Sequence, residues 1–176
     1  MKKMFSVLLL TSAIALSAGY KKGEELYGNE FSSANALGGA FANAFVPGSG
    51  LNKDGAFCIY GANGSNFITI KLDEQKLKGI IYLEAVVKGA GIKKAEKPYW
   101  GSKVMLVIKR KDGTVKYAEP AMLTRYGDFD WSRVIMIEQI PMDVESVTIM
   151  LGLQNTTGIF YIDSLKIFKG MKDNGQ

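Results

Sequence analysis

Histidine is absent from this chain of 176 residues, and cysteine occurs only once, as Cys58. The lack of histidine excludes Ser-His and Cys-His nucleophile pairs, histidine-bound zinc and histidine proton shuttles. One cysteine can form neither an internal disulfide nor a cysteine zinc site, so the fold must depend on its apolar core. Cys58 itself lies in the apolar run AFCIY and is expected to be a small, buried core residue.

The sequence also lacks a basic track, a phosphate-binding loop, a long amphipathic helix and tandem repeats. Its longest Lys/Arg run is Lys109-Arg110-Lys111, which is more typical of a solvated hairpin end than of a phosphate-binding surface. Gly61 to Gly64 is not followed by the lysine and the helix that a phosphate loop requires. We therefore expect no nucleic-acid partner.

The N-terminus reads as a secretory signal peptide over residues 1–19. It combines Lys2-Lys3, a short apolar run and the small residues Ser17, Ala18 and Gly19. The apolar run is too short for a membrane span, and Tyr20 stands where a lipoprotein would need cysteine. We expect a secreted or periplasmic protein without a transmembrane anchor. Cleavage would remove two lysines and no acid, which lowers the formal charge from +5 to +3.

The remaining chain is predicted to be one domain over residues 29–169, preceded by a polar tether at 20–28 and followed by a polar tail at 170–176. With 47% hydrophobic and 22% charged residues, it can form a packed core. Residues 29–50 are rich in Gly, Ala, Ser and Asn. They fit either a short strand with long loops or a short helix over 33–45, although Gly38-Gly39 argues against a long helix.

Strand patterns fill the rest of the domain. Apolar residues alternate with period two, or fill both faces, in Gly55–Tyr60, Ser65–Leu72, Gly79–Lys88, Lys103–Lys109, Val115–Tyr117, Trp131–Glu138, Val147–Leu153 and Ile159–Phe168. Asn63-Gly64 and Asp112-Gly113 predict hairpin turns. Eight or nine strands at this spacing, with apolar residues on both faces, predict an all-β sandwich of two antiparallel sheets.

The C-terminal part resembles a known family. From Gly127 the chain reads G-D-F-D-W, then an I-P-x-D hairpin, L-G-L-Q and T-G-I-F-Y-I-D-S-L-K-I. These motifs are similar to those of bacterial carbohydrate-binding modules of the jelly-roll, galactose-binding-like type that are attached to xylanases and endoglucanases. The resemblance extends upstream to Pro98–Leu106 and covers a little over half of the chain. It implies a jelly-roll fold, a polysaccharide ligand, a core position for Trp131 and a glycoside hydrolase in another chain as a partner.

Catalysis would have to rest on carboxylate pairs. Asp128 and Asp130 alternate at the start of one strand, and Asp143 and Glu145 alternate in a hairpin. A glycosidase needs two acids facing one substrate. These positions are more typical of turn capping and solvent exposure, so we do not expect an enzyme.

Sugar binding needs an aromatic platform surrounded by planar polar groups. Tyr99 and Trp100 stand together at the end of a loop, where they serve either as the platform or as loop anchors. Tyr82, Phe160 and Tyr161 are expected to be packing residues. The predicted ligand-binding residues are Tyr99, Trp100, Tyr117, Arg125, Tyr126, Gln154 and Asn155.

Asp163 is an acid within the apolar closing strand, which is costly unless it is paired or metal-bound. In the resembled modules the matching aspartate helps to hold a structural calcium together with the N-terminal strand, and Glu30 is the candidate partner here. Asp163 is followed by Ser164, where the family often has a second acid. The alternative is that Asp163 faces solvent or accepts backbone N–H groups in a bulge.

These observations predict a secreted, non-catalytic carbohydrate-binding protein that recognises a plant-type or bacterial polysaccharide. The alternatives are a structural or protein-interaction sandwich without sugar binding, and a small carbohydrate-active enzyme. The sequence does not name the sugar.

Overall fold

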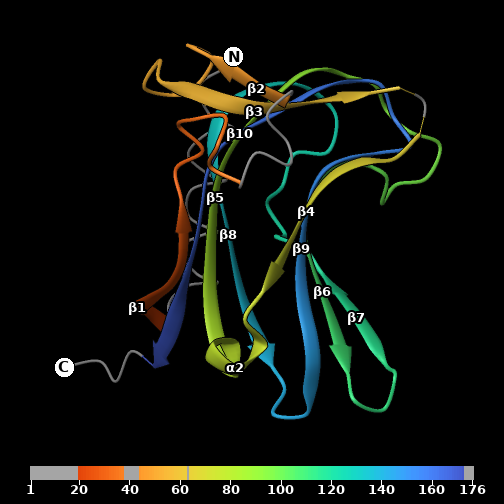
Figure 1. Ribbon diagram of the computed structural model, residues 1–176. Helices are drawn as coiled ribbons and strands as arrows, with labels where there is room; N and C mark the ends of the chain where they lie inside the picture. Colours follow the sequence, from red (N-terminus) through yellow and green to blue (C-terminus); the bar gives the residue numbers. More distant parts are fainter. Residues whose placement is uncertain (1–19, 38–43, 63, 173–176) are drawn as a thin grey trace, which may run out of the picture.

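The computed structural model describes residues 20–37, 44–62 and 64–172. In this part of the chain, ten strands and one helical turn form a sandwich of two antiparallel sheets (Figure 1). The predicted jelly-roll class is therefore confirmed. No helix among the described residues is both long enough and apolar enough to span a membrane.

The larger sheet has the order β2-β3-β10-β5-β8, and β1 also pairs with β10. Its strands are β1 (Tyr20–Asn29), β2 (Phe45–Pro47), β3 (Gly55–Gly61), β5 (Gly79–Ile92), β8 (Gly127–Ile140) and β10 (Gly158–Lys172). Strands β3 and β1 share one edge of β10, because β3 pairs with its first half and β1 with its second half. The other edge of β10 pairs with β5 along almost its whole length.

The smaller sheet has the order β4-β9-β6-β7. Its strands are β4 (Asn66–Leu72), β9 (Val144–Gln154), β6 (Gly101–Arg110) and β7 (Val115–Ala118). The predicted hairpin between β6 and β7 is confirmed, and Asp112 stabilises its turn by accepting a 2.9 Å hydrogen bond from the Thr114 N–H. The predicted hairpin between β3 and β4 is wrong, because the two strands belong to different sheets. Their connection crosses from one layer to the other.

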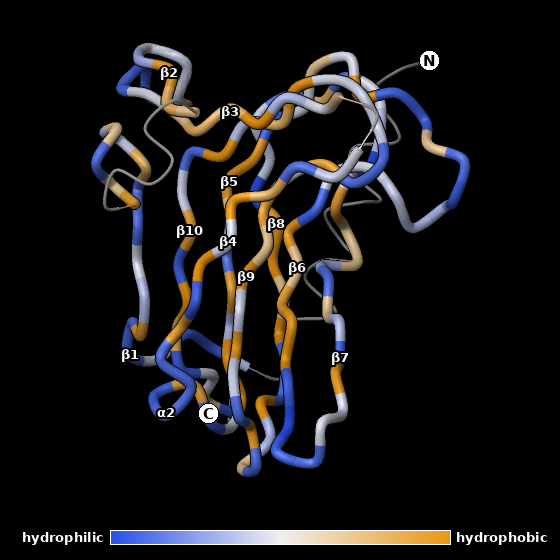
Figure 2. Tube along the Cα trace, turned by 45° about the vertical axis from the view of Figure 1, so that its right-hand side comes forward, coloured by the Kyte–Doolittle hydropathy of each residue, from blue (hydrophilic) through white to orange (hydrophobic). Residues whose placement is uncertain are grey.

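The core lies between the sheets, where the tube in Figure 2 is most strongly hydrophobic. On β9 the predicted inward stripe is confirmed, since Val147, Ile149, Leu151 and Leu153 are all fully buried. Phe160 is fully buried too, as predicted. Cys58 is also buried, and this burial raises the pKa of its thiol.

Several boundaries differ from the sequence-based expectation. Residues 20–28 are not a tether but most of β1, because the second half of β10 leaves an edge open and backbone pairing does not require apolar side chains. The connection at 73–78 contains the one-turn helix α2 (Glu74–Leu77), capped by Asp73. Strand β5 runs on to Ile92, into the expected loop. The signal peptide and residues 173–176 of the tail lie outside the described residues, as do residues 38–43 of the possible helix at 33–45. Residues 33–37 form a bend and a turn, and β2 begins at Phe45.

Trp131 is not in the core, contrary to what the family resemblance implied. It is half-buried on the outer face of the larger sheet, where its ring packs edge-to-face against Tyr161 with 6.3 Å between centroids. The Lys88 ammonium lies 5.9 Å from the same ring. Val134 and Met136 point to the opposite face of β8 from Trp131, and those two residues are the buried ones. Tyr82 also lies on the outer side of the sheet, near Lys22.

Candidate functional site

A cleft of about 420 Å³ opens where the loop at residues 93–100 faces the turn between β9 and β10. Figure 1 shows the two segments side by side at the upper right, at one end of the sandwich. Residues of the loop (Lys93, Lys94, Glu96 and Trp100) form one side, and residues of the turn (Asn155, Thr156 and Thr157) form the other. The cleft is open to solvent, so an extended ligand could enter along it.

Hydrogen bonds fix the two sides of the cleft to each other. The buried Thr156 hydroxyl donates to the Lys93 carbonyl over 2.5 Å, and the Lys93 N–H donates to the Thr157 carbonyl over 3.0 Å. At the start of the loop, Asp128 accepts a 2.6 Å hydrogen bond from the Gly91 N–H. The base of the loop is thus anchored on β8 and on the turn between β9 and β10, and these bonds preform the cleft.

Tyr99 and Trp100 form an aromatic pair on the loop. Their rings meet edge-to-face with 6.2 Å between centroids, and Tyr99 is 52% exposed while Trp100 is half-buried beside the cleft. The Lys97 ammonium lies 4.9 Å from the Trp100 ring centroid and 5.9 Å from that of Tyr99. An exposed aromatic pair at the rim of an open cleft suits a ligand with flat apolar faces.

Arg125 and Tyr126 hold this loop in place. The Tyr126 hydroxyl donates to the Pro98 carbonyl over 2.8 Å, and the Arg125 guanidinium donates to the Tyr99 carbonyl over 3.4 Å. The Arg125 carbonyl accepts a 3.0 Å hydrogen bond from the Ser102 N–H. In this structure the two predicted ligand-binding residues are therefore anchors of the aromatic loop.

An ion-pair network that sequence reasoning missed lies beside this anchor, on the outer face of the smaller sheet. Lys103 has only 2% of its side chain exposed, and its ammonium lies 2.5 Å from Glu119 Oε1. Arg125 Nη2 lies 2.6 Å from Glu119 Oε2. Glu119 thus lies between two cations, one on each of its carboxylate oxygens. Lys103 lies near the start of β6, a strand that is apolar on both faces, so the local sequence does not predict that this lysine is buried and paired with Glu119.

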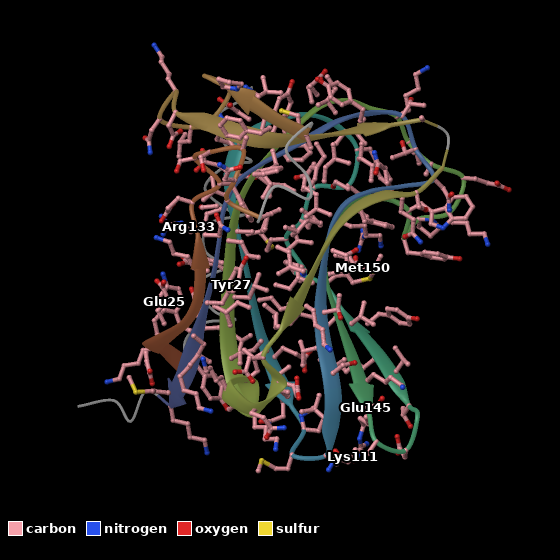
Figure 3. All side chains as sticks on the ribbon, in the orientation of Figure 1. Glu25, Tyr27, Lys111, Arg133, Glu145 and Met150 are labelled. Atoms are coloured by element: carbon pink, nitrogen blue, oxygen red, sulfur yellow. The ribbon has the colours of Figure 1, made fainter. Side chains whose placement is uncertain are left out.

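The remaining predicted ligand-binding residues divide into two groups. Gln154 ends β9 in register with Gly101, just after the aromatic loop, and Asn155 follows it and lines the cleft. Tyr117 is 65% exposed and lies further down the outer face of the smaller sheet, opposite Val107. Met150 points outward from β9 on this same face (Figure 3). The fold thus gathers six of the seven predicted residues around the loop and leaves Tyr117 apart.

The acids considered as catalytic pairs have other partners. Asp130 accepts a hydrogen bond from the Trp131 N–H and lies 3.6 Å from the Lys88 ammonium. Asp143 pairs with Arg110 over 2.7 Å, which lowers the pKa of this carboxyl. Glu145 pairs with Lys109 over 2.7 Å, near the hairpin end labelled in Figure 3. Together with the bond from Asp128 to Gly91, these contacts are turn caps and surface ion pairs.

Asp163 lies at a bulge in β10, between Ile162 and Ser164. Its Oδ1 accepts a 2.7 Å hydrogen bond from the Leu51 N–H, so the backbone alternative predicted for this residue is realised. Burial raises the pKa of Asp163, and the nearby charges of Asp54 and Glu30 raise it further. Glu30 itself forms an ion pair with Lys166.

Oxygen atoms gather beside Asp163 at the close approach of Gly50. A Cβ atom added to Gly50 would run into the Gly55 carbonyl, Asp54 Oδ1 and Asp163 Oδ1. Three oxygens therefore converge on one point, and oxygen ligands are what calcium prefers. No group of three His, Cys, Asp or Glu side chains suited to a metal occurs among the described residues. The carboxylates of Asp54 and Asp163 are too few to hold a calcium ion by themselves, so they fit one only if backbone carbonyls such as that of Gly55 are also ligands.

No protein-family model and no curated protein matches the chain. Solved structures do match it. The CBM22-1–GH10 modules of Clostridium thermocellum endo-1,4-β-D-xylanase 10B, complexed with xylohexaose, align with a TM-score of 0.58 at 15% identity. The alignment covers 83% of this chain and 28% of that longer chain.

Two single modules align over nearly their whole length. The CBM22-1 xylan-binding domain from Paenibacillus barcinonensis gives a TM-score of 0.61 at 14% identity, over 84% of this chain and 96% of that one. The C-terminal family 22 carbohydrate-binding module of the Clostridium xylanase gives 0.59 at 16% identity, over 82% and 94%. At such identities the likeness shows the fold. The resemblance to bacterial carbohydrate-binding modules is therefore confirmed as a resemblance of fold.

Proposed function

We propose that this protein is a non-catalytic polysaccharide-binding module whose ligand lies in the cleft between the loop at 93–100 and the turn at 154–157. The observation that carries this proposal is the aromatic pair Tyr99–Trp100, held at the rim of an open, preformed cleft with the amide side chain of Asn155 opposite. The fold shared with xylan-binding modules supports it.

Each residue of the site has a specific role in this proposal. The Trp100 ring stacks on the C–H face of a sugar, and Tyr99 extends the apolar surface outward. Asn155 and Gln154 offer amide donors and acceptors to ring hydroxyls. Arg125 and Tyr126 hold the loop in its binding conformation, which reduces the entropy lost on binding.

The setting of this activity is proposed on sequence grounds. The signal-like residues 1–19 support export from the cell, where polysaccharides are found. A glycoside hydrolase in another chain is a partner that the module could hold near its substrate. Xylan is the first polymer to test, because structurally similar modules are described as xylan-binding.

The test is affinity gel electrophoresis of the protein in gels that contain xylan, mixed-linkage glucan, mannan or cellulose derivatives. We expect retardation by at least one polymer, and loss of most of it in Trp100→Ala. Trp131→Ala is the matched control, since it removes the chain's other tryptophan from the opposite sheet. No retardation by any polymer would favour a structural or protein-interaction module instead. Release of reducing sugar would show an enzyme.

We further propose a structural calcium ion near Asp163, with Asp54 and backbone carbonyls of the loop at 50–55 as further ligands. Such an ion would neutralise carboxylates that otherwise repel one another and would connect this loop to β10. It would stabilise the folded state by binding it preferentially.

A further inference from the structure

Three lysines stand on the aromatic loop without a carboxylate partner among the described residues. Lys93, Lys94 and Lys97 are all exposed, and Glu96 is the acid that lies between them. Two other lysines of the smaller sheet are paired: Lys109 lies 2.7 Å from Glu145, and Lys116 lies 2.7 Å from Glu138. Three lysines and one glutamate give the loop a net charge of 3 − 1 = +2 at one edge of the cleft.

The positions of these lysines connect their charge to the ligand site. Lys93 and Lys94 line the cleft, and the Lys97 ammonium lies 4.9 Å from the Trp100 ring. The backbone of Lys93 is fixed at the cleft, because its N–H and carbonyl are both hydrogen-bonded to the turn at 156–157. A sugar stacked on Trp100 would thus have ammonium groups beside it.

The opposite side of the cleft adds a polar group that lacks a partner. The Thr157 hydroxyl is buried, yet it makes no hydrogen bond to any described residue. A buried hydroxyl without a partner costs free energy, so this turn is held in a conformation that it would not adopt for its own hydrogen bonds alone. Asn155 lines the cleft on the same turn, so an amide side chain faces the positively charged loop.

We propose that the cleft prefers polysaccharides that carry carboxylate groups, such as chains with uronic acid residues, over their neutral counterparts. The three lysines outnumber the single carboxylate of Glu96 at this cleft, and a carboxylate on the sugar supplies a further counter-charge. The proposal rests on the proposed function, because it assigns the ligand class of the same site. Aromatic stacking recognises the sugar ring, and the lysines recognise its acidic substituent.

The experiment compares glucuronoxylan with the same polymer after its carboxyl groups have been reduced to alcohols. Binding is measured by isothermal titration calorimetry at low and at high salt. We expect about tenfold tighter binding of the acidic polymer at low salt, because three exposed ion pairs of ordinary strength amount to roughly that factor. High salt should remove most of the difference.

The variant is Lys93→Gln/Lys94→Gln/Lys97→Gln, and its control is Lys76→Gln/Lys109→Gln/Lys116→Gln, which removes the same charge away from the cleft. The first should bind both polymers equally, and the second should keep the preference. Thermal melts of both variants show whether each is folded, and a folded loop variant that keeps the preference overturns the proposal.

The possible outcomes separate the two proposals. Equal binding of both polymers by the unmodified protein overturns the carboxylate preference and leaves polysaccharide binding intact. Binding of neither polymer, together with no retardation in the wider panel, overturns the proposed function itself. Tighter binding of a sulfated xylan than of glucuronoxylan overturns the assignment to uronic acids, since the site would then select anionic charge of another kind.

Discussion

The ammonium of Lys103 lies 2.5 Å from Glu119 Oε1, although the Lys103 side chain is only 2% exposed. The pair sits on the outer face of the smaller sheet, directly beside the arginine that anchors the aromatic loop. A buried ion pair contributes little net stability, but removing one partner leaves a charge that water cannot reach. Lys103 and Glu119 therefore connect the stability of the domain to the geometry of its site.

Glu119→Ala should lower the free energy of unfolding by about 3 kcal/mol, because it leaves Lys103 buried and uncompensated. The double variant Lys103→Met/Glu119→Leu should recover most of this loss, since it replaces both charges with apolar groups. Urea unfolding of the two variants and the parent measures the difference. If the single variant is as stable as the parent, Lys103 is not held by Glu119 in solution.

Tyr126→Phe should weaken polysaccharide binding several-fold while changing the melting temperature little. It removes the hydroxyl that donates to the Pro98 carbonyl, a hydrogen bond worth about 1 kcal/mol of local stability. Amide hydrogen exchange at Trp100, whose N–H donates to the Lys97 carbonyl, should become faster. Tyr117→Phe is the control, because the exposed Tyr117 hydroxyl makes no hydrogen bond to the described part of the chain. A direct ligand contact by Tyr126 would weaken binding without any change in exchange.

Trp131→Ala should lower the free energy of unfolding by about 1–2 kcal/mol, as expected for a half-buried ring that packs edge-to-face on Tyr161. A core tryptophan would cost about 3–5 kcal/mol on truncation to alanine. Chemical denaturation distinguishes the two values. A loss in the higher range would place Trp131 in the core, as the family resemblance suggested.

Asp163→Asn should raise the melting temperature at neutral pH when a chelator is present. The pKa of Asp163 is raised in the folded state, so the fold holds this proton more tightly than the unfolded chain does. The stability that comes from protonation is complete below the unfolded pKa of 3.8 and is lost as the pH rises through the folded pKa. The asparagine has no charge to lose. Its advantage should therefore shrink as the pH falls towards 4.

In the presence of calcium, the parent protein should melt at a higher temperature than Asp163→Asn. The parent protein should gain stability on addition of calcium, whereas Asp163→Asn should gain much less, because it lacks a carboxylate ligand. Asp112→Asn serves as the control: this aspartate lies on an exposed hairpin turn far from Gly50, and its loss should leave the response to calcium unchanged. Coincident melting curves of the parent with calcium and with chelator would show that no calcium ion binds here.

Local alternation was enough to predict most of the fold. A side chain's face on a strand depends only on its position along that strand, so the buried stripe of β9 could be read directly from the sequence. The same alternation placed Trp131 opposite Val134 and Met136, but it did not say which face is buried, and the prediction that Trp131 lies in the core was wrong. The adjacent aromatics of the loop were equally visible, because Pro98 and Gly101 delimit them.

What the sequence could not show is which strand pairs with which. Asn63-Gly64 predicts a turn, but whether β3 and β4 then pair or enter different sheets depends on the distant strands β10 and β9. The polar residues of β1 give no strand signal, and they become a strand because the edge of β10 is free to pair with their backbone. Lys103 of β6 meets Glu119, which directly follows β7, because these two strands pair with each other. Period-two patterns record the face of each side chain, whereas sheet partners are decided by contacts between residues far apart in the chain, which only the tertiary structure brings together.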